Sequence, residues 1–383
     1  MEFINVKLSD IGEVVGGATP STKNPDNYDG NIAWITPKDL AGYNKVYISK
    51  GERNINEMGF KSCSTKILPK NSVLFSSRAP IGYVAISAND LCTNQGFKSI
   101  IPNDKIDYKF LYYLLKHNKD YIASKGSGST FKEVSGSVMK GIELSIPKNI
   151  NDQKKISKVL FDIDKKIELN NEINNNLLQL CKTNYLRIIE ENSVEISLSE
   201  LMDYQGGSQP PASEFQKEKN EDNIRFVQIR DFETDSYICY IPNSNKNKLC
   251  NKDDILIARY GASLGRICYG LSGAYNVALA KVLPKKAEYK ELLRVILESD
   301  DFYNYINQVG QRSAQAGFNA GDIAGYTVII PNENELKIFN SISKNIIDKR
   351  LLMIEENRKL SELRDTLLPK LMNGEIDLDN IEI

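Results

Sequence analysis

The sequence of 383 residues repeats itself at long range, and this duplication limits the folds that the chain can adopt. Tyr121-Ile122, Gly126, Gly141 and Ile146-Pro147 recur as Tyr305-Ile306, Gly310, Gly325 and Ile330-Pro331, at a constant spacing of 184 residues. Leu8-Ser9-Asp10 similarly matches Leu198-Ser199-Glu200, and Val73-Leu74-Phe75 with Arg78 matches Ile255-Leu256-Ile257 with Arg259. Solenoid repeats have periods of about 20 to 50 residues, so this longer period indicates two copies of a domain.

A run without glycine or proline follows each copy, over residues 148–191 and 332–368. Apolar residues in both runs recur at steps of three and four, which is the spacing of a coiled-coil seam or a long packed helix pair. Ordinary core helices show the same spacing, but the mean globular helix has only about 11 or 12 residues. We therefore favour two long helices acting as a spacer, and we expect Pro369 and Gly374 to mark the end of the second.

Within each copy, short runs of β-branched and aromatic residues bounded by turn residues predict strands, and Leu-rich stretches predict short helices. The strands are expected at residues 32–35, 72–75, 83–86, 254–257 and 326–330, and the short helices at 107–117 and 289–298. The predicted fold is α+β, with two tandem similar domains, each followed by a long α-helix. The expected boundaries are 1–150 and 193–332 for the domains, 151–192 for the central helix, and 333–383 for the C-terminal helix and tail.

Composition excludes several classes of enzyme. The single histidine, His117, argues against histidine triads and zinc–histidine chemistry, and it is expected to be a packing or capping residue. Six dispersed cysteines without a C-x-x-C pair indicate free, mostly buried thiols in a reducing compartment. Because there is no signal-peptide pattern and no long apolar run, we expect a soluble cytoplasmic protein. Motifs for phosphate loops, nucleophile elbows, zinc proteases and dinucleotide binding are absent from the sequence, so we expect no catalytic site.

The net charge of −1 alone argues against a nucleic-acid-binding protein, but the charge is unevenly distributed. Residues 58–89 and 255–287, at matching places in the two copies, contain no acidic residue and several basic ones. A polyanion close to both surfaces explains such tracts. The stretches 121–132 and 305–319 are also free of acidic residues and rich in Ser, Gln, Asn, Lys or Arg. Either stretch alone could be a solvated surface loop, but its repetition beside the basic tracts favours contact with nucleic acid.

Several motifs together resemble the specificity subunit of a type I DNA restriction–modification enzyme, over essentially the whole chain. They are Leu8-Ser9-Asp10-Ile11-Gly12, Gly17-Ala18-Thr19-Pro20, Trp34-Ile35-Thr36-Pro37-Lys38-Asp39-Leu40, Leu74-Phe75-Ser76-Ser77-Arg78-Ala79-Pro80-Ile81-Gly82, Asn94-Gln95-Gly96-Phe97 and Leu367-Leu368-Pro369-Lys370-Leu371-Met372-Asn373-Gly374-Glu375-Ile376. The second copy departs from the pattern, with Gly207-Ser208-Gln209-Pro210 and Asn276-Val277-Ala278-Leu279.

The resemblance implies that each α+β copy is a target-recognition domain for one half of a split sequence in double-stranded DNA. It also implies that the two long helices pack as an antiparallel coiled-coil spacer and dock two methylation subunits, and that motor–nuclease subunits complete the complex. This chain would perform no chemistry and bind no cofactor. S-adenosylmethionine would be bound by the methylation subunit, which methylates adenine.

The residues expected to contact DNA carry cationic or amide side chains. Lys and Arg would mostly neutralise phosphates, although Arg can also bind guanine, and Gln and Asn could pair with adenine. They are Arg78, Lys98, Lys125, Ser129, Thr130 and Lys132 in the first copy, and Arg230, Arg259, Arg266, Gln311, Arg312, Gln315 and Asn319 in the second. Two alternatives remain at this point, a cytoplasmic coiled-coil scaffold without DNA specificity and a single-chain nuclease or methyltransferase.

Overall fold

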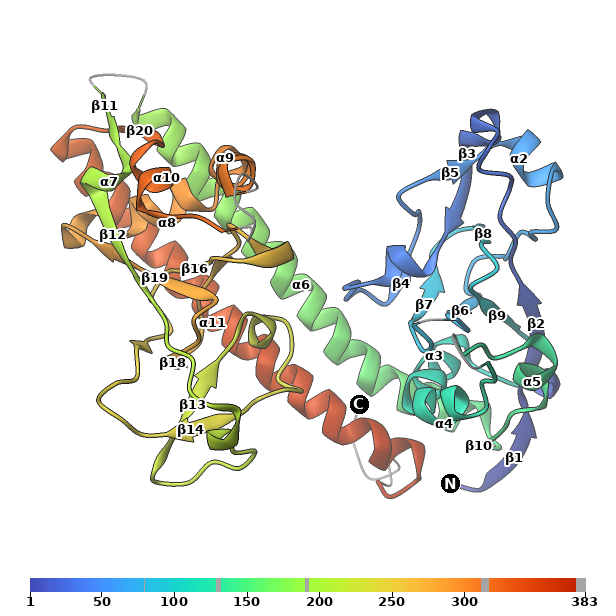
Figure 1. Cartoon of the computed structure of the whole chain (residues 1–383). Coiled ribbons are helices and arrows are strands. Elements are labelled where there is room, and N and C mark those ends of the chain that lie inside the picture. The colour runs from blue at the N-terminus through green and yellow to red at the C-terminus, as the bar shows by residue number, and fades with distance from the viewer. Residues whose placement is uncertain (79, 129–131, 190–192, 311–316, 377–383) are drawn as a thin grey trace. The chain divides into compact units, whose positions relative to one another are not determined.

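The computed structural model describes residues 1–78, 80–128, 132–189, 193–310 and 317–376 (Figure 1). The chain divides into two compact units, residues 1–169 with 359–383, and residues 170–358. Each unit contains one α+β copy together with part of both long helices, and we describe the units separately.

The first copy is built from three sheets. The five-stranded sheet has the order β2 (Gly12–Gly16), β9 (Lys98–Pro102), β6 (Val73–Phe75), β7 (Val84–Ser87), β4 (Tyr47–Ile48). The three-stranded sheet has the order β5 (Asn54–Ile55), β3 (Tyr28–Ile35), β8 (Cys92–Thr93), and β1 (Phe3–Lys7) pairs with β10 (Glu143–Pro147). The helices are α1 (Leu8–Ile11), α2 (Glu57–Lys61), α3 (Tyr108–His117), α4 (Lys119–Ser124) and α5 (Gly136–Gly141), with short 3-10 helices η1 (Pro25–Asn27) and η2 (Pro37–Leu40).

The second copy has a closely similar arrangement. One four-stranded sheet has the order β12 (Met202–Gly206), β19 (Leu279–Pro284), β16 (Leu256–Ala258), β17 (Ile267–Cys268). The other has the order β14 (Tyr240–Pro242), β13 (Asn223–Val227), β18 (Gly273–Tyr275), β15 (Leu249–Cys250), and β11 (Val194–Ser197) pairs with β20 (Thr327–Ile330). The helices are α7 (Leu198–Leu201), α8 (Lys290–Leu297), α9 (Asp300–Gly310) and α10 (Ala320–Ala324), with η3 (Ala212–Glu214), η4 (Ile229–Phe232), η5 (Gly261–Ser263) and η6 (Ala287–Tyr289).

The predicted strands and short helices are present, with ends shifted by a few residues. Asp107 begins α3 because its carboxylate accepts the Phe110 N–H at 2.9 Å and so caps the helix. The apolar face of α3 then packs Phe110 and Leu114 into the same core as Val73 of the five-stranded sheet. The positions of Leu residues in the sequence therefore identified this helix correctly.

Equivalent hydrogen bonds close the two copies. The N–H of Leu8 donates to the carbonyl of Ile142 at 3.0 Å, and the N–H of Leu198 donates to the carbonyl of Tyr326 at 2.8 Å. Each bond joins the first short helix of a copy to the residues before its last strand, so that the ends of each copy lie together. The duplication inferred from the sequence is thus a duplication of the fold.

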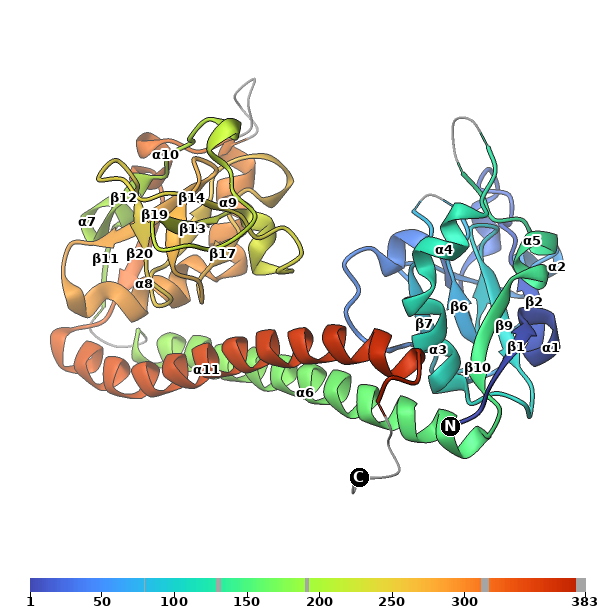
Figure 2. The ribbon, with the colours of Figure 1, turned by 90° about the horizontal axis from the view of Figure 1, so that it is seen from below.

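The long helices are α6 (Ile150–Ile188) and α11 (Glu333–Met372), seen side by side in Figure 2. They pack antiparallel within each unit. In the first unit Asp164 of α6 contacts Arg364 of α11, and in the second unit Asn170 contacts Asn357. The residue numbers of α6 rise as those of α11 fall, so the fold is the predicted α+β architecture with an antiparallel helix pair.

The end of the second helix, expected at Pro369 and Gly374, is confirmed at Gly374 but not at Pro369. Pro369 lies inside α11, and the helix continues to Met372. Gly374 then ends the helix with φ of 72°, where its N–H donates to the Leu371 carbonyl at 3.3 Å and the Glu375 N–H donates to the Lys370 carbonyl at 2.9 Å. This is a Schellman motif, which favours glycine because a Cβ atom on a residue with a left-handed backbone conformation would clash with the neighbouring backbone.

The two stretches expected to be loops are partly helical. The first four residues of 121–132 belong to α4, and residues 305–310 belong to α9. Both helices begin before these stretches, at Lys119 and Asp300, and continue into them.

Candidate nucleic-acid interface

A tight turn after β8 forms the centre of the candidate surface in the first copy. We call residues 94–97 the Asn94 turn. The N–H of Asn94 donates to the Ile35 carbonyl at 2.9 Å, and its side-chain Oδ1 accepts the Gly96 N–H at 2.9 Å. The Gly96 carbonyl then accepts the Ser77 N–H at 2.8 Å. These bonds join the end of β3, the turn and the loop after β6 into one surface.

The second copy contains the same turn with a different sequence. We call residues 276–279 the Asn276 turn. The N–H of Asn276 donates to the Val227 carbonyl at 3.0 Å, and its Oδ1 accepts the Ala278 N–H at 2.7 Å. The Ala278 carbonyl accepts the Arg259 N–H at 2.8 Å. The departure of this copy from the family pattern therefore changes side chains and preserves the backbone.

A pair of matched glycines lets another loop approach each turn. A Cβ atom on Gly17 would lie 2.1 Å from the Thr93 carbonyl oxygen, and one on Gly207 would lie 2.2 Å from the Asn276 carbonyl oxygen. Such distances are impossible for a real Cβ atom, so only glycine permits this packing. The glycine in each Gly-x-x-Pro segment is thus required for the surface to form.

The structure brings four predicted DNA contacts of the first copy together around Glu133. The backbone of Glu133 pairs with that of Arg78 and exchanges hydrogen bonds with Ser127 at 2.9 and 3.0 Å. The carboxylate of Glu133 lies 3.4 Å from Nζ of Lys98. Lys125 precedes Ser127 by two residues and Lys132 directly precedes Glu133, and both lysines are exposed. Ser129 and Thr130 lie outside the described residues.

The predicted contacts of the second copy are more dispersed. Arg230 lies in η4 with its guanidinium carbon 4.9 Å from the centre of the Tyr237 ring, and Arg266 forms an ion pair with Glu233. Asn319 begins α10, where its Oδ1 accepts the Gly321 N–H at 2.7 Å. The same Oδ1 also accepts the Asp322 N–H at 3.3 Å, so both acceptor sites of the amide oxygen are occupied, while the side chain that was expected to contact a base stays exposed. Gln311, Arg312 and Gln315 lie outside the described residues.

Arg259 is held between two tyrosines. Its guanidinium carbon lies 5.0 Å from the centre of the Tyr260 ring and 5.9 Å from that of Tyr204. Its Nε is buried without a hydrogen-bond partner among the described residues. Cation–π contacts hold a guanidinium in place while leaving the donors at its edge available. Arg259 is therefore a positioned cation that can still bind an anion.

The sequence match of Arg78 with Arg259 is off by one residue. The equivalent bonds to the Gly96 and Ala278 carbonyls pair Ser77 with Arg259. Arg78 then corresponds to Tyr260, because the backbone of Arg78 forms an isolated β-bridge with Glu133 and the backbone of Tyr260 forms one with Gly317. Both copies carry an arginine in this segment, one residue apart in equivalent position, and the sequence comparison therefore paired Arg78 with Arg259.

Lys38 is an exposed basic residue that is not among the DNA contacts predicted from the sequence. It occupies the second position of η2, as Arg230 does in η4. In both helices an aspartate caps the first turn, with Asp39 accepting the Thr36 N–H at 2.7 Å and Asp231 accepting the Gln228 N–H at 3.0 Å. The shared capping-box spacing was the signal that could have revealed the match.

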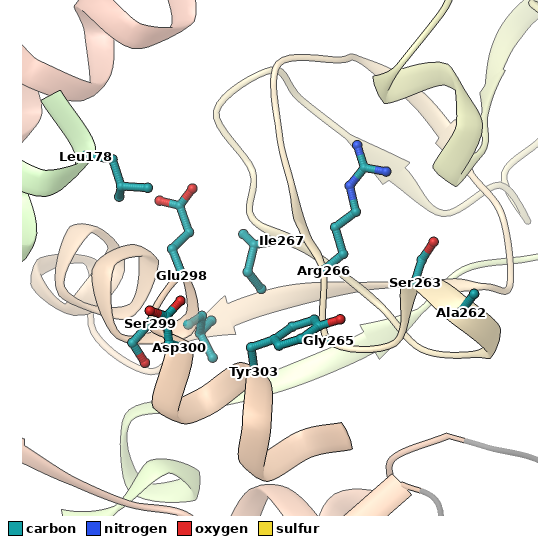
Figure 3. Close-up of a pocket in the computed structure, with 11 residues that line it drawn as sticks. Leu178, Ala262, Ser263, Gly265, Arg266, Ile267, Glu298, Ser299, Asp300 and Tyr303 are labelled. Carbon is teal, nitrogen blue, oxygen red and sulfur yellow. The ribbon is translucent and has the colours of Figure 1, made fainter. Parts of the chain in front are cut away.

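A cavity of about 490 Å³ lies beside the second copy, at α6, and Arg266 is one of its lining residues (Figure 3). The others are Leu178, Ala262, Ser263, Gly265, Ile267, Leu297, Glu298, Ser299, Asp300 and Tyr303. Two of these are carboxylates, which repel a nucleic-acid backbone. We therefore do not include this cavity in the candidate DNA surface.

The described residues provide little sign of chemistry. Within them, no group of three or more histidine, cysteine or acidic side chains is arranged to hold a metal ion. His117 ends α3, where burial lowers its pKa. The cysteines are free, and four of the six are buried, as predicted. Burial raises the pKa of the Cys250 thiol to about 11 and that of Cys268 to about 12, so both are inert structural thiols at neutral pH. None of the described helices is long and apolar enough to cross a membrane.

Comparisons with known proteins give a consistent result. A family model described as the type I restriction modification DNA specificity domain matches residues 2–179. The chain is 33% identical to the type I restriction enzyme MjaIX specificity subunit of Methanocaldococcus jannaschii, over 98% of this chain and 94% of the relative. It is 29% identical to the EcoR124I/EcoR124II specificity subunit of Escherichia coli over 41% of this chain and 40% of the relative. The type I restriction–modification S subunit of M. genitalium has a similar fold, with a TM-score of 0.59 and 18% identity over 97% of this chain and 96% of that one.

The repeated fold and the family match together define a DNA-specificity protein with two similar α+β domains. The chain belongs to the family of type I restriction enzyme specificity subunits. It is thus a non-catalytic DNA-specificity subunit of a type I restriction–modification system, and the scaffold interpretation is not favoured.

Proposed function

We propose that each α+β copy recognises one half of a bipartite target in double-stranded DNA, and that α6 and α11 set the spacing between the halves. One observation carries this proposal. The Asn94 and Asn276 turns have the same backbone hydrogen bonds, but the exposed residue that follows the asparagine is Gln95 in one copy and Val277 in the other. Two domains that recognise different DNA sequences need the same backbone structure with different side chains on the surface that contacts the bases.

The candidate contacts divide by chemistry. The exposed cations Arg78, Lys125 and Lys132 suit phosphates, and Lys98 needs only to exchange Glu133 for a phosphate. In the second copy Arg230, Arg259 and Arg266 take this role. The amides and hydroxyls remain proposed base contacts, namely Ser129, Thr130, Gln311, Gln315 and Asn319, and Arg312 could bind guanine bidentately.

The helix lengths support a role in spacing. Helices of 39 and 40 residues are about 58 to 60 Å long, which exceeds the 34 Å of one turn of B-DNA. Both helices are continuous, so an insertion in both should lengthen the separation that they impose.

The partners follow from the same proposal. Two methylation subunits would dock on the helices, hold S-adenosylmethionine and methylate adenine, and motor–nuclease subunits would complete the restriction complex. Ile338, Ile342 and Leu352 are exposed on α11 in the second unit, at 49%, 37% and 63% of their surface. At about 100° per residue they form one stripe on the helix. An exposed apolar stripe is suited to a protein partner.

A domain exchange tests the function. Residues 1–150 would be replaced by those of a relative, and the complex with the methylation subunit would be used to map methylated adenines genome-wide. We expect one half of the recognised sequence to change and the other half to stay. A change in both halves would disprove modular recognition. Inserting four residues into both helices should lengthen the unread gap between the halves, and an unchanged gap in a folded protein would disprove the spacer role.

A further inference from the structure

Lys38 and Arg230 occupy equivalent places beside the two turns. The strand before η2 ends at Ile35 and the strand before η4 ends at Val227, and both of these residues accept the N–H of the turn asparagine. Each basic residue follows three positions later. The carbonyl of each also accepts the N–H three residues on, at 3.1 Å in both copies. Lys38 and Arg230 therefore occupy equivalent backbone positions in the two copies.

Both 3-10 helices pack against the turn or its core. A Cβ atom on Gly96 would lie 2.7 Å from the Pro37 side chain, so η2 touches the Asn94 turn directly. In the second copy Ile229 packs against the core that contains Leu279, the last residue of the Asn276 turn. Ala278 has the Cβ atom that Gly96 lacks, and Ile229 stands at the position of Pro37, so both positions of the contact seen in the first copy differ in the second.

The two cationic groups are accessible. The side chain of Lys38 is 78% exposed and pairs with Glu52 at 2.7 Å, and that carboxylate is itself 67% exposed. An ion pair so exposed is weak and can be exchanged for a stronger anion. Arg230 is exposed and stacks on Tyr237, and among the described residues no ion pair of Arg230 is found. Stacking leaves the planar edge of a guanidinium free for a phosphate.

The residues nearby differ between copies in a way that separates two roles. Gln95 is replaced by Val277 and Thr19 by Gln209, whereas the basic character of Lys38 is kept in Arg230. Phosphate contacts position a protein on DNA and carry no sequence information, and base contacts carry it. A charge that is kept while its neighbours change is therefore expected at a phosphate.

We propose that Lys38 and Arg230 are equivalent phosphate contacts, one for each half of the DNA target. This inference rests on the proposed recognition of one half-site by each copy. It adds a position that the sequence did not identify in the first copy, and it pairs this position with Arg230, which already has the phosphate role in the second copy.

The test uses the complex of the full chain with its methylation subunit. Lys38→Gln, Arg230→Gln and the double variant would be compared with Lys148→Gln. Lys148 is a matched control, since its side chain is 59% exposed and its Nζ lies 3.1 Å from Glu2. Affinity would be measured against salt concentration for a duplex with the target and for one without it. Lys38→Arg and Arg230→Lys would keep the charge.

We expect the slope of log K against log salt to become shallower by about 0.9 for each single variant and about 1.8 for the double variant. The loss of affinity should be equal for the duplex with the target and the duplex without it. The methylated sequence should stay the same. Lys38→Arg and Arg230→Lys should restore the slope of the unaltered protein. A double variant with the slope of the Lys148 control would overturn the proposal. A changed methylated sequence would also overturn it, because it would show a base contact. Mapping of methylated adenines with the unaltered complex shows independently whether the target is bipartite. Failure of this inference is therefore distinguishable from failure of the proposed function.

Discussion

Arg364 and Asp164 form a largely buried ion pair, with 2.6 Å between Nη1 of the guanidinium and Oδ1 of the carboxylate. The hydroxyl of Tyr113 donates to the other carboxylate oxygen at 2.7 Å. Burial lowers the pKa of Arg364, but the Asp164 carboxylate outweighs this effect and the net shift is upward. One carboxylate thus joins α3, α6 and α11 within the first unit.

Removal of Asp164 should therefore destabilise the first unit strongly. Asp164→Ala removes the buried partner of the Arg364 guanidinium and leaves it with Asp365, whose carboxylate lies 2.8 Å away but is 65% exposed. Loss of a buried partner costs about 3 to 5 kcal/mol. We expect this decrease in the free energy of unfolding measured in urea. Asp162→Ala is the control, because Asp162 forms an exposed pair with Lys158 at 2.9 Å and should change stability by less than about 1 kcal/mol. Equal losses in the two variants would contradict the structural role of Asp164.

Stability should fall at alkaline pH because of the buried thiols. Burial raises the pKa of Cys268 to about 12 from the ordinary value of 9.0. Above about pH 9 the unfolded chain loses this proton while the folded chain keeps it. The folded state then binds more protons, so stability falls as pH rises from about 9 to 12. Each such thiol contributes a slope of up to about 1.4 kcal/mol per pH unit.

Cys268→Ala isolates this contribution. The variant loses packing at every pH, but its stability should fall less steeply between pH 9 and 10 than that of the unaltered chain. Urea unfolding in the presence of a reductant measures both slopes. Parallel curves would show that the Cys268 thiol does not carry the effect.

The sequence predicts the large elements of this fold because their signals are periodic. The spacing that places Ile156 and Leu160 in the core continues for many turns, so neither long helix could be missed. The end of α11 was less predictable. Pro369 has no N–H to donate to the carbonyl four residues before it, but its fixed φ is compatible with a helix, and the last turn continues to Met372.

The details of the surface depend on backbone contacts that the sequence does not display. The second copy has one more residue between its strand and Gly265 than the first copy has before Gly82, as the equivalent bonds to Ala258 and Ser76 show. The two copies also carry arginine at neighbouring positions of this segment, so Arg259 was matched with Arg78 rather than with Ser77. Lys38 lies in the motif Trp34-Ile35-Thr36-Pro37-Lys38-Asp39-Leu40, and the capping bonds of Asp39 and Asp231 show that it corresponds to Arg230.

Gly17→Ala should disturb recognition by the first copy alone. Its Cβ atom would lie 2.1 Å from the Thr93 carbonyl and 2.2 Å from that of Asn94, so the Asn94 turn must move. Overpacking of this kind costs about 1 to 3 kcal/mol. We expect weaker DNA binding and relaxed sequence preference in the half-site of the first copy, measured by mapping methylated adenines. Gly141→Ala is the control, because a Cβ atom there meets nothing within 4 Å. Relaxation of both half-sites would contradict the assignment.

Glu133→Gln should strengthen DNA binding. The carboxylate of Glu133 neutralises Lys98 at 3.4 Å on the proposed DNA surface, and the equivalent residue of the second copy is Gly317, which carries no charge. Removing the negative charge frees the Lys98 ammonium for a phosphate and removes a repulsion. We expect tighter binding and a steeper decrease of log K with log salt, on duplexes with or without the target. Glu143→Gln removes an exposed carboxylate that lies 4.0 Å from Lys7, between the paired strands β1 and β10. An equal gain in that control would mean that net charge alone is responsible, and no gain in Glu133→Gln would place the surface around Lys98 away from DNA.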